Sequence, residues 1–257
     1  KTSIIISARR TFADLLARTI ISLASDGKVK AGYFYHDVNA KIYHRFSSKD
    51  RLYLSTYFGK DKGIYEEISE DVSDNGFLES VRGFDINWGN ITNDIRWNHV
   101  YGPKLFSNLT ATFSNYQFNL TSSISDEFVE NNTVLKDQSS LRYFSGIRDY
   151  AIIMDLDYAP HALHSIETGI NFTYHRFQPG VQTVNTSVSN EFRSETLQSG
   201  SIEALEYYGY LEDDFSLTRQ LKINIGIHYS GFQVNNTSYQ SLQPRLSARY
   251  MLMDNLS

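Results

Sequence analysis

The feature that most constrains this chain is a strict alternation of apolar and polar side chains, clearest in residues 220–231, QLKINIGIHYSG. Every second position carries a large apolar residue: Leu221, Ile223, Ile225, Ile227 and Tyr229. Because side chains of a β-strand point alternately to opposite faces, this pattern predicts a strand with one apolar and one polar face. The apolar face has to contact either a second sheet or lipid.

Similar segments recur along the whole chain, and only residues 12–24, FADLLARTIISLA, have a pattern compatible with a helix. The predicted strands number about ten: 2–9, 32–46, 51–59, 85–100, 105–119, 142–158, 163–177, 203–217, 220–233 and 240–253. The sequence therefore predicts an all-β protein.

The composition excludes several other classes of protein. No run of 18 apolar residues exists, which excludes a transmembrane helix but not a transmembrane barrel, whose strands are only half apolar. The chain has no cysteine, so disulfides, thiolate metal sites and cysteine nucleophiles are excluded. A net charge of −5, with acids and bases interspersed, gives no basic surface for nucleic acid.

The connections between the predicted strands alternate between tight and long. Tight turns are predicted at 47–50, 102–104, 159–162, 218–220 and 254–255, and long polar loops at 10–31, 60–84, 120–141 and 178–202. Outer-membrane barrels place short turns on the periplasmic side and long loops outside, whereas β-sandwiches scatter both kinds over both ends. The order favours an antiparallel, meandering transmembrane β-barrel segment over a sandwich or propeller.

Aromatic residues cluster beside the tight turns: Phe46, Tyr53, Trp97, Tyr101, Phe106, Tyr158 and Phe215. Such a cluster is typical of the aromatic girdle at a membrane interface, although ordinary packing at strand ends also produces it. On the membrane interpretation, the apolar face of 220–231 touches lipid and the polar face lines a lumen.

KTSIIISARRTFADLL and DVNAKIYHRFSSKDRLYLSTYFGKD are two of several segments that resemble parts of a known barrel family, the Bacteroidetes-type TonB-dependent receptors. The opening KTSIIISARRTFADLL is similar to a strand and loop of that family, and DVNAKIYHRFSSKDRLYLSTYFGKD to a recurring hairpin. WGNITNDIRWNHVYGPKLFSNLTATFSNY, the pair IRDY and TYHRFQPG, and the closing YQSLQPRLSARYMLMDNLS are similar to further barrel strands.

The resemblance implies a receptor in the outer membrane of a Gram-negative bacterium that imports a bulky ligand, energised through TonB. We expect residues 1–257 to form a partial barrel domain, with the plug, the TonB box and the terminal strands absent, so that both ends look cut. Expected partners are outer-membrane lipids, the remainder of the barrel, a plug domain, TonB by resemblance, and a surface lipoprotein.

Candidate site residues follow from this picture. Aromatic faces that can stack on sugars or planar ligands are expected near the outer rim: Tyr33, Tyr35, Tyr57, Tyr65, Phe84, Trp88, Tyr143 and Phe144. Polar side chains expected to face the lumen are Arg45, Asp155, Asp157, His175, Arg245 and Arg249. Asp155 and Asp157 are expected to pair with arginine or lysine from neighbouring strands or from a plug.

Other polar clusters are interpreted as structural. Arg9, Arg10 and Asp14 are expected to anchor a loop through salt bridges, and the acidic segment 65–74 to be a solvated loop rather than a calcium site. No residue pattern predicts a catalytic site, a metal site or a cofactor, so we expect no enzyme activity.

Two further functions are compatible with the sequence. One is a non-transporting barrel or scaffold subunit of an outer-membrane assembly, and the other is a soluble all-β binding protein of the cell surface.

Overall fold

The computed structural model describes residues 1–73, 76–130, 133–188 and 191–252. They form one antiparallel sheet and one helix, α1 (Ala13–Ala24). The strands are β1 (Thr2–Arg10), β2 (Val29–Arg45), β3 (Asp50–Ser73), β4 (Gly76–Gly102), β5 (Leu105–Glu130), β6 (Thr133–His161), β7 (His164–Val188), β8 (Glu191–Gln198), β9 (Ile202–Ser216), β10 (Leu221–Val234) and β11 (Thr237–Tyr250).

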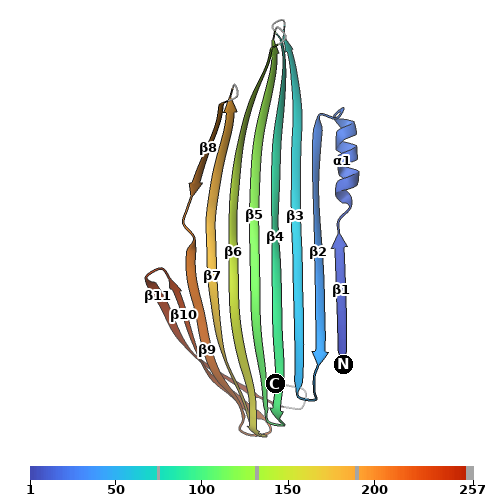
Figure 1. Cartoon of the computed structure of the whole chain (residues 1–257). Helices are drawn as coiled ribbons and strands as arrows, with labels where there is room; N and C mark the ends of the chain where they lie inside the picture. The colour runs from blue at the N-terminus through green and yellow to red at the C-terminus, as the bar shows by residue number, and fades with distance from the viewer. Residues whose placement is uncertain (74–75, 131–132, 189–190, 253–257) are drawn as a thin grey trace.

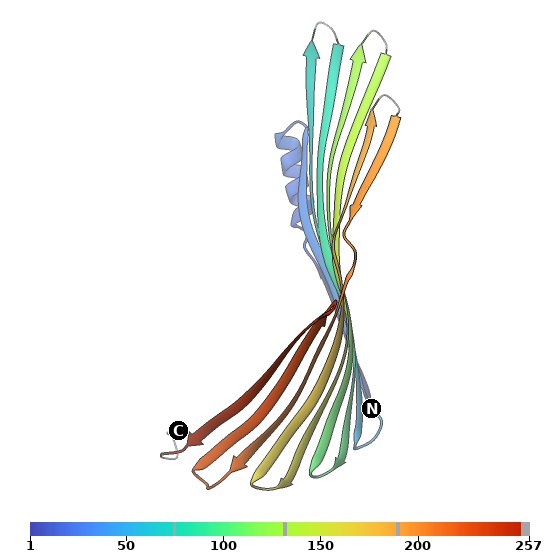
Figure 2. The same ribbon diagram turned by 90° about the vertical axis from the view of Figure 1, so that its left-hand side faces the viewer.

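The sheet is a meander, in which each strand pairs with its neighbours along the chain in the order β1 to β7, then β9, β10 and β11. The short strand β8 pairs with the far end of β7 and shares that edge with β9. Figures 1 and 2 show a single, strongly twisted layer, with the tight turns at one end and the long hairpins at the other.

A sandwich core is absent from the described residues. Ala204 is the one buried apolar residue among them, and Ile5, Ile152, Ile225 and Leu246 are each more than half exposed. A β-sandwich would bury such residues between two sheets, so this single layer contradicts the sandwich alternative.

The tight turns lie where the sequence predicts them. The described connections at this end are short, between β2 and β3, β4 and β5, β6 and β7, and β9 and β10. Ser47 fixes the first of these turns, because its hydroxyl accepts the backbone N–H groups of Lys49 and Asp50. The turn predicted at 254–255 lies outside the described residues.

The prediction of long loops is wrong in most of their length. Residues 60–73 and 76–84 continue β3 and β4 as paired strands, and 120–130 with 133–141 continue β5 and β6 in the same way. Residues 178–188 and 191–198 form the hairpin of β7 and β8. Strands β3 to β7 therefore run for 24 to 29 residues, far beyond the roughly 9–11 residues that a membrane-spanning strand needs.

The helix expected within 12–24 is confirmed as α1, in the connection between β1 and β2. Asp26 and Gly27 follow it with positive φ angles of 50° and 82°, a conformation that ends helices. The expected salt bridges at its start are also present, since Arg10 pairs with Asp14 at 3.3 Å and Arg9 with Asp37 at 2.5 Å.

Candidate functional site: the polar face of the sheet

The strand register separates the side chains of the sheet into two faces, because directly opposed residues of paired strands project to the same side. One continuous row across nine strands is polar apart from its glycine: Arg45, Arg51, Asn98, Asn108, Asp155, Gly169, Tyr210, His228 and Gln243. Three residues further along the strands from this row, on the opposite face, lies an apolar row: Ile42, Leu54, Ile95, Ala111, Ile152, Phe172 and Tyr207. The sheet is therefore amphipathic as a whole.

The apolar face is open and is bounded by aromatic side chains. Ile152 is 58% exposed and Phe172 50% exposed. On the side away from the tight turns, the rings of Tyr150 and Tyr174 lie with their centroids 6.4 Å apart. On the side of the tight turns, the His164 ring stacks on Phe215 with a centroid distance of 4.5 Å. The part of β6 and β7 between these aromatics is an apolar belt, as is the matching part of the other strands.

The aromatic residues expected beside the tight turns divide between the two faces. Trp97, Tyr101, Tyr158 and Phe215 lie on the apolar face, in line with an interfacial position. Tyr53 and Phe106 instead line a polar hollow on the opposite face together with Arg51 and Asp94. An aromatic residue next to a turn is therefore not enough to predict which face it joins.

The six polar residues expected to face the lumen lie on one face of the sheet, the polar face: Arg45, Asp155, Asp157, His175, Arg245 and Arg249. Arg245 pairs with Glu212 at 2.8 Å, and His175 lies 2.8 Å from Asp149 and 3.3 Å from Glu206. The His175 contacts join β7 to its neighbours β6 and β9, and the Arg245 contact joins β11 to β9 across β10.

The two aspartates on β6 do not find the cationic partners expected from neighbouring strands within the described residues. Asp155 accepts a hydrogen bond from the Tyr210 hydroxyl at 3.0 Å, and Asp157 lies opposite Glu167 in the register. Glu167 in turn lies opposite Glu212. Because an aromatic hydroxyl and further carboxylates lie next to these aspartates, the part of the polar face on β6, β7 and β9 is acidic, with Arg245 paired to Glu212 at its edge.

Seven of the eight predicted ligand-binding aromatics lie on the polar face: Tyr33, Tyr35, Tyr57, Tyr65, Phe84, Trp88 and Tyr143. Phe144 lies on the other face, because it is opposed to Asn119 and follows Tyr143 by one position. A shift of one residue along a strand reverses the face, and the strand register at that point cannot be predicted from the sequence.

Four of these aromatics come together with two residues that sequence reasoning missed, Asp61 and Phe118. The rings of Tyr33 and Trp88 stack with their centroids 6.2 Å apart, and the Tyr33 hydroxyl donates a hydrogen bond to the Asp61 carboxylate. The rings of Phe118 and Tyr143 meet edge to face, with their centroids 6.1 Å apart. Tyr35, Asp61, Trp88 and Phe118 also follow one another in a single cross-strand row. We call Tyr33, Tyr35, Asp61, Trp88, Phe118 and Tyr143 the aromatic cluster.

The aromatic cluster combines flat ring faces with a carboxylate acceptor, which suits a sugar or another planar polar ligand. Asp61 was overlooked because residues 60–84 were interpreted as a loop, although it continues the alternation Tyr57, Gly59, Asp61. Tyr65 and Phe84 lie opposite each other farther along the same hairpin. There the hydrogen bond to Glu67 raises the pKa of Tyr65.

No described helix is long and apolar enough to cross a membrane. No group of three or more histidine, aspartate or glutamate side chains in the described ranges is arranged to hold a metal ion.

Comparisons with known proteins address the family directly. The family described as TonB dependent receptor-like, beta-barrel matches residues 21–257, nearly the whole chain. No curated protein matches the chain. Among solved structures, the ferric yersiniabactin uptake receptor FyuA from Yersinia pestis aligns over 87% of this chain at 8% identity, with a TM-score of 0.29.

The alignment covers 50% of the FyuA chain, so this chain spans about half the length of that receptor. Because this TM-score is low, the family assignment rests on the family match and not on the structural alignment. An amphipathic antiparallel meander with short turns at one end agrees with that match, and the family consists of outer-membrane transport receptors rather than enzymes. This chain belongs to the family of TonB-dependent receptor-like β-barrels.

Proposed function

We propose that the chain forms part of the barrel wall of a receptor that takes up a bulky ligand across the outer membrane of a Gram-negative bacterium, with energy supplied through TonB. The observation that carries this proposal is the division of one sheet into an exposed apolar face and a continuous polar face. Lipid accepts an exposed apolar face, and a lumen accepts a polar one.

In this arrangement the tight turns lie on the periplasmic side and the long hairpins project outside the cell. The length of β3 to β7 supports it, because the outer segments of β3 and β6 carry charged residues on both faces. Lys30 pairs with Glu66 at 2.6 Å and Lys28 with Glu70 at 3.1 Å in this outer part.

The aromatic cluster is the proposed ligand contact on the lumen wall. Its rings come from β2, β4, β5 and β6, so a ligand lying across them would touch four strands at once. Tyr57, Tyr65 and Phe84 extend the same face, while Phe144 is not part of the proposal because it points to the other side.

The acidic part of the polar face, on β6, β7 and β9, is the proposed contact for a plug domain. Asp157, Glu167 and Glu212 follow one another in the register, and Arg245 pairs with Glu212 across β10. Basic side chains of a plug would neutralise the remaining carboxylates. TonB would act on that plug. Further barrel strands would pair with β1 and β11, and a surface lipoprotein would cover the long hairpins.

The non-transporting subunit is the second candidate, since it would have the same two faces without a ligand. A soluble surface protein is disfavoured, because its apolar residues would need a second layer that the described residues do not form.

The test of uptake uses the two tryptophans of β4, which lie on opposite faces of the same strand. Mass spectrometry of spent growth medium would first compare cells that carry the intact gene with cells that lack it. It would identify the solutes that only the cells with the gene remove from the medium. We expect W88A to slow their depletion about tenfold, the loss typical of a buried aromatic contact, and deletion of TonB to abolish it.

The matched control is W97A, which removes the same side chain from the apolar face and should leave depletion unchanged at equal amounts of protein in the membrane. Equal losses in both variants would contradict the proposed ligand contact. A gene deletion that changes no solute would contradict transport and favour the scaffold subunit.

A further inference from the structure

Two arginines lie side by side on the apolar-face side of the sheet without an acidic partner. Arg148 on β6 and Arg176 on β7 are directly opposed in the register, and both are exposed. Neither makes a hydrogen bond or an ion pair with a described residue. Like charges placed directly opposite each other destabilise a strand pair, so their presence here calls for a bound anion.

The acidic residue nearest in the register forms no ion pair with them. Glu203 on β9 lies opposite Arg176, but its carboxylate accepts the hydrogen bond of the Tyr174 hydroxyl. On the other side of the pair, Arg148 lies opposite Asn115 of β5, which is uncharged. The row Asn115, Arg148, Arg176 therefore carries two positive charges and one amide before it reaches Glu203.

The position of the pair relates it to the edge of the apolar belt. Tyr150 and Tyr174 are the next pair toward the tight turns on the same face, followed by Ile152 and Phe172. The arginines thus lie just past the aromatic boundary of the belt, on the side away from the tight turns. This is the level at which lipid headgroups meet a membrane protein.

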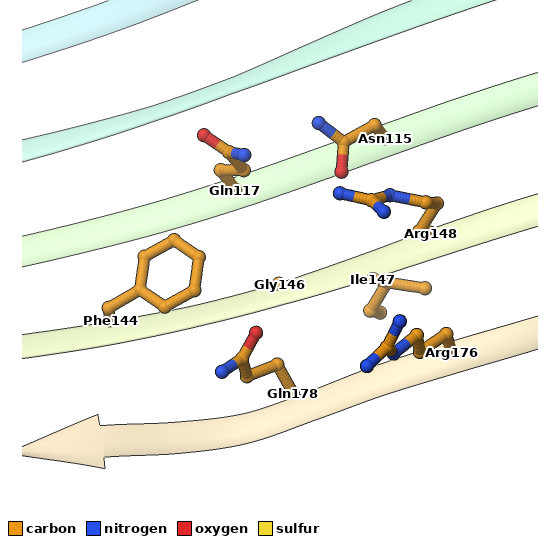
Figure 3. A pocket seen from close by; sticks show the side chains of 8 residues that line it. All are labelled: Asn115, Gln117, Phe144, Gly146, Ile147, Arg148, Arg176 and Gln178. Carbon is orange, nitrogen blue, oxygen red and sulfur yellow. The ribbon is translucent and has the colours of Figure 1, made fainter. Parts of the chain in front are cut away.

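A hollow of about 240 Å³ lies beside the two guanidinium groups. Its lining adds three side-chain amides, Asn115, Gln117 and Gln178, each of which can donate hydrogen bonds. Figure 3 shows both arginine side chains extending along their strands toward the end where Gln117 and Gln178 lie.

The floor of the hollow is open because Gly146 lies in it, at a register shift between β6 and β7. A Cβ atom at this position would lie 3.0 Å from the Tyr116 carbonyl oxygen, which is tighter than ordinary contact. A side chain here would both crowd β5 and fill the space between the amides.

We propose that Arg148 and Arg176 bind the phosphate group of an outer-leaflet lipid. Two planar guanidinium forks match the oxygens of a phosphate, and the amides around the hollow supply further donors. A lipid rather than free phosphate is the occupant because the arginines lie on the same face as the exposed belt, and only the pair Tyr150 and Tyr174 separates them from Ile152 and Phe172, where acyl chains would lie. The proposal depends on the membrane position of the belt and does not depend on transport.

The test is native mass spectrometry of the full-length protein in detergent, with phosphatidic acid, the uncharged diacylglycerol, or inorganic phosphate added in turn. We expect phosphatidic acid to remain bound and diacylglycerol to be lost. The double variant R148Q/R176Q should bind phosphatidic acid at least about tenfold more weakly, because two charge-assisted contacts are lost. R148K/R176K should fall between the two, since lysine keeps the charge but lacks the fork.

The matched control is R193Q on β8, whose side chain is 85% exposed and which removes the same charge away from the belt. Binding that drops equally in R193Q and in the double variant would overturn the proposal, as would a double variant that binds normally. Retention of inorganic phosphate as strong as that of phosphatidic acid would overturn the choice of a lipid.

Discussion

At the scale of single residues, two side chains on the polar face reach across an entire strand because a glycine lies beneath each of them. Tyr210 on β9 crosses Gly169 on β7 to reach Asp155 on β6. Arg245 on β11 meets Glu212 on β9 across Gly226 of β10. Glycine inside a strand predicts a close approach of this kind, but the sequence alone does not reveal which side chain makes it.

Replacement of Gly169 by alanine tests this arrangement. The added Cβ would lie 2.5 Å from Asp155 Oδ1, 2.6 Å from Tyr210 Cε1 and 3.0 Å from the Met154 carbonyl oxygen, so the bridge has to break or the strands have to shift. We expect the free energy of unfolding to fall by about 1–3 kcal/mol, the usual cost of overpacking. Urea unfolding of the full-length protein in detergent, followed by its heat-modifiable mobility, measures the loss.

The control is G209A, whose added Cβ would meet its nearest neighbours, Gly169 O and Ile170 Cγ2, at 3.6 and 3.7 Å. These are ordinary contacts, so G209A should unfold near the wild-type urea concentration. A G169A protein as stable as G209A would show that the Tyr210 bridge adds nothing.

At the scale of strands and turns, the sequence predicted the parts of each strand that lie in the apolar belt and missed the parts beyond it. Within the belt only one face is apolar, so alternation is visible, as in residues 150–158. In residues 60–73 charged residues lie on both faces and apolar ones are interspersed among them, so the same backbone pairing leaves no clear period-two signal. The interpretation of 65–73 as a solvated loop failed for this reason, and residue 74 lies outside the described ranges.

The same reasoning explains which site residues were predictable. Asp155 and Asp157 were assigned to the polar face correctly because they alternate with Ile152, Met154 and Leu156 in the belt. Phe144 lies beyond the belt, where only the register determines the face. The pairing of Arg148 with Arg176 likewise depends on register and could not be predicted from either strand alone.

The tight turn between β2 and β3 is tied to β4 through Asp50. Asp50 Oδ1 lies 2.6 Å from His99 Nδ1 and accepts the Trp97 indole N–H at 3.2 Å, while Ser47 donates to Oδ2 at 2.8 Å. The hydrogen bonds to His99 and Ser47 lower the pKa of Asp50 below its ordinary value.

This pKa shift predicts how the turn responds to pH. A carboxyl group with a lowered pKa in the folded state stabilises the protein above its unfolded pKa, and that contribution is lost as the pH falls through the folded pKa. We expect D50N to unfold at lower urea than the wild type at pH 7, and the difference to shrink once the pH falls below about 4. A difference between the two proteins that is as large well below pH 4 as it is at pH 7 would contradict the ionised contact.

At the scale of the whole molecule, the described residues form an open sheet with β1 and β11 at its two edges. Unpaired backbone N–H and C=O groups at such edges are not tolerated in lipid. In the membrane, either further strands pair with both edges or β1 and β11 pair with each other. Both solutions keep the apolar face outside and the polar face inside, so the central claim does not depend on which one holds.

The most direct test of that claim is a spin-label scan along β6 in the full-length protein reconstituted in lipid. The chain has no cysteine, so single cysteines can be placed at each position from 150 to 158 and labelled. We expect collisions with lipid-soluble oxygen to peak at 152, 154 and 156, and collisions with a water-soluble nickel complex to peak at 153, 155 and 157. Equal accessibility of neighbouring positions, or access of the nickel complex to 152 and 154, would contradict a sheet with one face on lipid and the other on a lumen.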